Sequence, residues 1–75
     1  MSVVLIADDD AKLRAELKKA LEKAGHRVIE AATARDTIYE AQDHDPDLML
    51  VDISLPGMPA LQLLEEIRSE SSLAR

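Results

Sequence analysis

Two groups of aspartates in this chain could do chemistry together. Asp8, Asp9 and Asp10 follow one apolar run near the N-terminus, and Asp52 follows another. If these runs are neighbouring parallel strands, the carboxylates lie at the sheet edge where ligands bind in open α/β folds. Carboxylates held close together repel one another, and a bound cation would offset that repulsion. Oxygen ligands without cysteine favour Mg²⁺, so the sequence predicts a magnesium site at Asp8, Asp9 and Asp52.

The chemistry that such a site supports is phosphoryl transfer. An aspartate beside bound Mg²⁺ can attack phosphorus and form an acyl phosphate, while the metal offsets charge on the phosphoryl oxygens. Asp52 strengthens the prediction of a shared site, because it precedes a Pro-Gly loop rather than a helix and has no local capping role. Acidic residues at strand–helix junctions often only cap helices. Capping is the favoured role of Asp10, and for Asp8 and Asp9 taken alone it is about as well supported as metal binding.

The hydrophobic pattern predicts the elements that must position these residues. Short apolar runs predict strands, and apolar residues three and four apart predict helices. The predicted strands are residues 3–7, 27–31 and 48–52, the third of them buried, and the predicted helices are residues 10–24, 34–44 and 60–70. This alternation predicts an α/β fold with a parallel sheet and right-handed crossovers. Parallel strands need cover on both faces. Because only three strands are predicted, one strand edge is also expected to lie open to pairing with another chain.

Helix ends and helix surfaces carry further expectations. Gly25 suits the left-handed residue that closes the first helix, and Thr33 is expected to cap the second. Arg14 and Lys18 are interpreted as part of a solvated face with little ion-pair stabilisation. The single aromatic residue, Tyr39, is expected to be half buried on the second helix.

The third predicted helix carries its apolar residues mainly on one face. Leu61, Leu64 and Ile67 share that face, and Leu63 lies beside it. The polar segment from Ser69 to Arg75 is expected to fray.

Composition excludes several classes of function. A formal net charge of -6 repels polyanions, so direct nucleic-acid binding is not expected. The longest apolar run is too short to cross a bilayer, and there is no signal-peptide pattern, which indicates a cytoplasmic protein. No cysteine is available for a disulfide or a thiolate metal site. His26 and His44 are interpreted as exposed loop residues that are neither metal ligands nor phosphocarriers.

Two segments resemble a known family. Residues 4–10 (VLIADDD) and residues 46–58 (PDLMLVDISLPGM) are similar to the first- and third-strand signatures of the receiver domains of two-component response regulators. The similarity spans essentially the whole chain, and the spacing between the two segments also fits.

The resemblance implies a fold and a set of roles. The fold is a flavodoxin-like doubly wound parallel sheet, of which this chain supplies a (βα)3 half with strand order 2-1-3 and an open edge at the third strand. Asp52 is implied to be the phospho-acceptor for a histidine kinase or phosphotransfer domain, and the chain is not itself an enzyme. Asp9 is implied to bind Mg²⁺ directly, Asp8 through metal-bound water, and Ser54 through its backbone carbonyl.

The sequence departs from the family in two ways. Pro59-Ala60 stands where Asp-Gly is usual, which alters the entry to the third helix. The family's Ser/Thr after a fourth strand, its Lys after a fifth strand and its switch aromatic have no counterpart here. Phosphoryl transfer is therefore expected to be slow or lost, whereas metal binding could survive.

Two alternatives remain open. The chain could be a truncated or engineered half-domain that associates with itself through the open sheet edge and keeps the site as a relic. More remotely, Asp8-x-Asp10 is similar to the aspartate pair of haloacid-dehalogenase-like phosphatases, although Lys12 stands where that pattern has Thr or Val.

Overall fold

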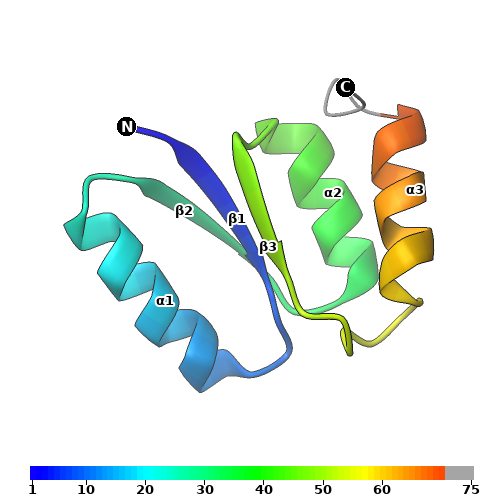
Figure 1. The fold of residues 1–75 in the computed structure, drawn as a ribbon, viewed down its shortest axis with the longest axis horizontal. Coiled ribbons are helices and arrows are strands. Elements are labelled where there is room, and N and C mark those ends of the chain that lie inside the picture. The colour runs from blue at the N-terminus through cyan, green and yellow to red at the C-terminus, as the bar shows by residue number, and fades with distance from the viewer. Residues whose placement is uncertain (71–75) are drawn as a thin grey trace.

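The computed structural model describes residues 1–70 of the chain (Figure 1). Its elements, in chain order, are β1 (Val3–Ala7), α1 (Ala11–Lys23), β2 (Arg27–Ala31), α2 (Ala34–His44), β3 (Leu48–Val51) and α3 (Ala60–Glu70). No strand or helix boundary differs from the predicted range by more than one residue. Most of the segment for which we expect fraying, residues 71–75, lies outside the described part. Among the described residues, no helix is long and apolar enough to span a membrane.

The sheet has the predicted topology. Its strand order is β2-β1-β3, and β1 pairs in parallel with both neighbours. In the pairing of β1 with β3, Ala7 lies opposite Val51, so the two strands end at the same level. The α/β fold with order 2-1-3 is therefore confirmed, and β3 forms one edge of the sheet, as predicted.

The helices cover the two faces of the sheet unequally. α1 lies on one side, and α2 and α3 lie on the other (Figure 1). Side chains alternate along β1, so Leu5 and Ala7 join the larger core with α2 and α3, while Val4 and Ile6 join a smaller core against α1. All four are almost fully buried, so β1 is covered on both faces.

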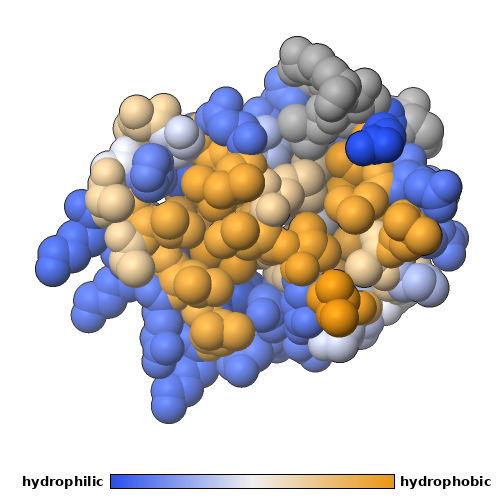
Figure 2. All heavy atoms as spheres, viewed as in Figure 1, coloured by the Kyte–Doolittle hydropathy of each residue, from blue (hydrophilic) through white to orange (hydrophobic). Residues whose placement is uncertain are grey.

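β3 is covered on one face only, which corrects the prediction of a fully buried third strand. Met49 and Val51 pack against the larger core. On the opposite face Leu48 is 52% exposed and Leu50 is 38% exposed. The physical reason is that α1 packs on β1 and β2 and leaves this face of β3 open. Figure 2 shows apolar side chains gathered across this side of the molecule, over the sheet and again over α3.

The helix ends form as their residues predict. Asp10 is the N-cap of α1 and accepts hydrogen bonds of 3.1 Å from the amides of Lys12 and Leu13. Gly25 follows the helix with φ of +96°, where a side chain would be strained. Thr33 caps α2 through its hydroxyl oxygen, which accepts from a backbone amide at 3.1 Å.

Two expectations about helix surfaces are wrong. Tyr39 is 64% exposed rather than half buried. On α3, Leu63 and Ile67 enter the larger core, whereas Leu61 and Leu64 are exposed. The spacing of four between Leu63 and Ile67 is as good a helical stripe as the predicted one, and the packing of α3 against α2 selects between them.

Candidate acidic site at the ends of β1 and β3

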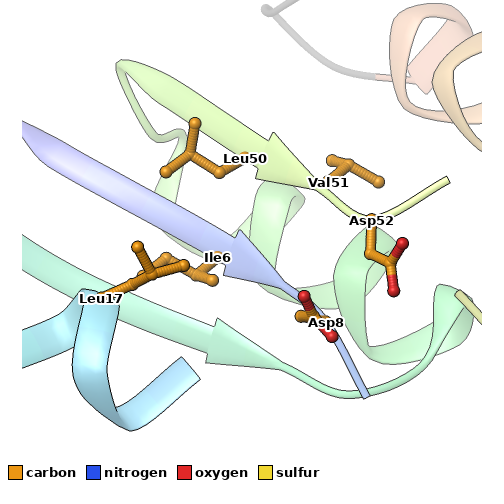
Figure 3. Close-up of a pocket in the computed structure, with 6 residues that line it drawn as sticks. All are labelled: Ile6, Asp8, Leu17, Leu50, Val51 and Asp52. Carbon is orange, nitrogen blue, oxygen red and sulfur yellow. The ribbon is translucent and has the colours of Figure 1, made fainter. Parts of the chain in front are cut away.

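Three carboxylates converge at the carboxyl ends of the two neighbouring strands. Asp8, Asp9 and Asp52 each offer an oxygen, and these oxygens all lie within 4.8 Å of one another. Asp8 follows β1 and Asp52 follows β3, and Figure 3 shows the two side chains next to each other at the strand ends. The residues that the sequence predicts to meet in space do so.

Backbone hydrogen bonds fix this convergence. The amide of Asp52 donates to the carbonyl of Ala7 at 2.9 Å, and the amide of Asp8 donates to the carbonyl of Ala31 at 3.0 Å. Both bonds continue the ladders of the sheet by one residue, so each aspartate is held where the pairing of its strand ends.

The three consecutive aspartates have different local partners. One carboxylate oxygen of Asp8, Oδ1, accepts from the amide of Asp10 at 2.9 Å. Asp10 is committed to capping α1, as expected, which argues against the phosphatase-like alternative in which Asp8 and Asp10 act as a pair. Within the described residues, the exposed carboxylate of Asp9 makes no hydrogen bond or ion pair. Its oxygens are the most readily available to a cation.

Ser54 contacts the carboxylate of Asp52 in a way that sequence reasoning missed. Its hydroxyl lies 3.0 Å from both Oδ1 and Oδ2 of Asp52, and its amide donates to Oδ1 at 3.1 Å. Asp followed two residues later by Ser at a strand end is a sequence signal for such a local turn. The role of the Ser54 carbonyl as a metal ligand stays a prediction.

The loop after Asp52 is packed against the start of α2. The carbonyl of Pro56 accepts from the amide of Ala34 at 3.0 Å, and Leu55 is buried. Gly57 has φ of +113°, and a Cβ placed there would lie 3.0 Å from the Cβ of Ala34. Glycine is thus required at this position for two reasons, the positive φ angle and the close approach of Ala34.

Arg14 also reaches this site from α1. Its Nη1 donates to the carbonyl oxygen of Asp8 at 2.6 Å, and its Nε lies 3.3 Å from Oε1 of Glu30 on β2. Lys18 lies 3.4 Å from the other oxygen of Glu30. The interpretation of Arg14 as one of several solvated charges is therefore wrong, because its side chain is 17% exposed and bridges three segments. No sequence signal distinguishes it from the other basic residues of the helix.

An apolar hollow opens beside the acidic residues. It has a volume of about 270 Å³ and lies between α1 and the uncovered face of β3 (Figure 3). Its lining residues are Ile6, Asp8, Leu17, Leu50, Val51 and Asp52. The two carboxylates therefore border apolar surface on one side.

Both histidines lie elsewhere and differ from their predicted setting. His44 is the last residue of α2, not a loop residue, and its Nε2 lies 3.4 Å from carboxylate oxygens of Glu40 and Asp43. His26 is partly buried, and its Nδ1 accepts from the amide of Ser2 at 3.3 Å. These contacts are local to the helix end and to the N-terminal strand.

The sequence matches a known family along most of its length. The model of the response regulator receiver domain family matches residues 4–74. One relative is the transcriptional regulatory protein PhoP of Escherichia coli (strain K12), which is 39% identical over 66 residues. This alignment covers 88% of the chain but only 30% of PhoP, so the chain spans about a third of that relative.

Solved structures of the same kind resemble the fold. A LuxR-family two-component response regulator from Aurantimonas sp. SI85-9A1 superposes with a TM-score of 0.87 at 26% identity, covering 100% of this chain and 55% of that chain. A chain from a crystal structure of histidine kinase ThkA in complex with response regulator TrrA superposes with a TM-score of 0.84 at 28% identity. The coverage in that case is 95% of this chain and 61% of the other.

Proposed function

The chain belongs to the response regulator receiver domain family, and from this premise we propose that it is the phospho-accepting segment of a two-component response regulator. Asp52 takes a phosphoryl group from a phosphohistidine of a histidine kinase or phosphotransfer domain. A carboxylate oxygen of Asp52 forms the new bond to phosphorus as the P–N bond breaks, and the electron pair and a proton end on the imidazole. The chain is an acceptor in this reaction, not an enzyme.

One observation carries this proposal: the meeting of Asp8, Asp9 and Asp52 within 4.8 Å at the ends of adjacent strands. Three carboxylates that close together repel one another, and hard oxygen donors suit Mg²⁺. When bound, Mg²⁺ supplies positive charge that offsets the phosphoryl oxygens. Residues of this chain thus form a donor set that fits the metal.

The local hydrogen bonds support different tasks for the ligands. Asp9 would hold the metal directly, since its carboxylate has no competing partner within the described residues. Asp8 would act through water, because its Oδ1 already accepts from the amide of Asp10 at 2.9 Å. The carbonyl of Ser54 would complete the protein ligands. A histidine kinase as the partner draws support from the similar chain found in the ThkA–TrrA complex. We propose a cytoplasmic location as well.

Phosphorylation by a small acyl-phosphate donor tests the proposal. The protein is incubated with acetyl phosphate and Mg²⁺, and intact mass reports a phosphoryl adduct that hydroxylamine removes. We expect the adduct in the wild type and in Asp43→Asn, which changes an exposed carboxylate on α2, but not in Asp52→Asn. Absence of an adduct from the wild type would leave only the self-association proposal, whereas persistence of the adduct in Asp52→Asn would exclude Asp52 as the acceptor.

A second function draws support from the uncovered apolar surface. The exposed large apolar residues include Leu48, Leu50, Ile53, Leu61 and Leu64. Figure 2 shows apolar surface over the sheet and over α3 on one face of the molecule, and β3 forms an edge of that sheet. Contiguous apolar surface and unpaired strand edges are sites of protein association. We therefore also propose self-association through β3, which is compatible with phosphorylation or with a relic site.

A further inference from the structure

The guanidinium of Arg14 holds the peptide group that joins the first two aspartates of the site. Nη1 donates a 2.6 Å hydrogen bond to the carbonyl oxygen of Asp8. That carbonyl belongs to the planar peptide between Asp8 and Asp9, so its orientation sets the direction in which the chain leaves toward Asp9. A hydrogen bond from a charged donor is stronger than one between neutral groups.

Arg14 is itself held from β2. Its Nε lies 3.3 Å from Glu30, and Glu30 also lies 3.4 Å from Lys18. Glu30 pairs with Ile6 in the sheet, and is therefore fixed to the same strand that leads to Asp8. The guanidinium can satisfy both acceptors at once because its donors form a rigid fork.

We propose that Arg14 is a positioning residue for the cation site, keeping Asp8 and Asp9 directed toward Asp52. This inference rests on the proposed function of that site. Arg14 does not bind the metal or touch the phosphoryl group. It acts through the backbone of Asp8, and Glu30 acts through Arg14.

Whether removal of Arg14 weakens or tightens cation binding distinguishes a positioning role from a purely electrostatic one. If Arg14 acted only as a nearby positive charge, its removal would tighten binding of a divalent cation. If it positions the ligands, its removal weakens binding. The charge effect is the smaller one, because the carboxylate of Glu30, 3.3 Å from Nε, offsets the charge of Arg14.

The test measures Mn²⁺ affinity from the electron paramagnetic resonance signal of the unbound ion, in the whole chain. We expect Arg14→Gln to weaken binding roughly tenfold, in line with the loss of a charge-assisted hydrogen bond. Arg14→Lys keeps the charge but cannot bridge both acceptors, so it should recover less than half of the lost Mn²⁺ affinity. The matched control Lys18→Gln removes a cation that pairs with Glu30 without touching Asp8, and should stay within about twofold of the wild type.

A second readout needs no metal. The amide of Asp10 donates to Asp8 at 2.9 Å, so its hydrogen exchange reports the order of this loop. Exchange at Asp10 should accelerate in Arg14→Gln and not in Lys18→Gln, with circular dichroism confirming that both are folded. If Arg14→Gln does not fold, Arg14→Lys and Glu30→Ala provide the same comparison.

The outcomes test the positioning role of Arg14 separately from the existence of the cation site. Unchanged or tighter Mn²⁺ binding in Arg14→Gln, with normal binding by the wild type, overturns the positioning role alone. Full rescue by Arg14→Lys shows that the bridge to Glu30 is not needed and overturns the role of Glu30 in positioning. Failure of the wild type to bind Mn²⁺ overturns both this inference and the proposed cation site.

Discussion

The amide of Asp52 donates a 2.9 Å hydrogen bond to the carbonyl oxygen of Ala7, the residue directly before Asp8. The sheet ladder itself therefore brings the two ends of the site together. A shift of one residue in the pairing of β1 with β3 would turn every side chain of β3 to the other face. The packing of Met49 and Val51 in the larger core opposes such a shift, so the core stabilises the site geometry.

Asp9 and Asp10 should contribute to different properties. Asp10→Ala should lower the free energy of unfolding by about 1 kcal/mol, because α1 loses its N-cap. Asp9→Ala should leave stability within about 0.5 kcal/mol, since it removes no hydrogen bond, yet it should abolish cation binding. Urea denaturation in EDTA measures the stabilities. Equal losses from both substitutions would contradict this division.

Removal of the Ser54 hydroxyl should speed phosphorylation of Asp52. The hydroxyl lies 3.0 Å from both carboxylate oxygens, and an oxygen that attacks phosphorus must give up such a hydrogen bond. Ser54→Ala should raise the rate with acetyl phosphate roughly two- to tenfold, given the usual net strength of one hydrogen bond. Ser54→Thr keeps the hydroxyl and should remain near the wild type. A slower Ser54→Ala would show instead that the hydroxyl assists the reaction.

Substitution of Gly57 should cost more stability than substitution of Gly25. Both have positive φ, but only at Gly57 does a Cβ meet a neighbour, 3.0 Å from the Cβ of Ala34. We expect a loss of about 1–2 kcal/mol for Gly25→Ala and about 2–4 kcal/mol for Gly57→Ala. Urea denaturation gives both values. Equal losses would mean that the loop after β3 moves away from α2 without penalty.

Self-association should depend on the uncovered face of β3. Light scattering after size exclusion is expected to show a mass that rises with protein concentration. Leu50→Lys should shift the protein toward the monomer, because it places a charge on that face. The matched control Tyr39→Lys changes an exposed apolar residue on α2 and should leave the mass unchanged. A wild type that is monomeric at every concentration would refute the association proposal.

Short-range patterns in the sequence predict the strands and helices, whereas the strand order, and with it the convergence of the aspartates, follows from the resemblance to receiver domains. The apolar runs that end at Ala7 and Val51 identify two parallel strands, and the resemblance to receiver domains supplies their adjacency. Asp10 as a cap and Gly25 as a helix terminator are likewise local features. Each depends on a few neighbouring residues, so it can be predicted without knowledge of the tertiary packing.

The errors concern side chains whose surroundings are set by packing between elements. Leu48 and Leu50 follow the pattern of a buried strand, but α1 covers β1 and β2 instead. Leu61 is exposed because α3 turns Leu63 toward the core. The bridge made by Arg14 depends on the position of α1 over β2, which no local spacing encodes.

Whether Asp8, Asp9 and Asp52 share one cation is tested most directly by paramagnetic broadening. Substoichiometric Mn²⁺ is added to ¹⁵N-labelled protein, and the intensity of each amide signal is followed. We predict that signals of residues 8–10 and 52–54 disappear first and that Asp9→Asn abolishes the effect. Glu40, Asp43 and His44 on α2 also offer ligand atoms within 4.8 Å of one another. Broadening that begins at these residues, or no selective broadening at all, would contradict a shared cation site at the ends of β1 and β3.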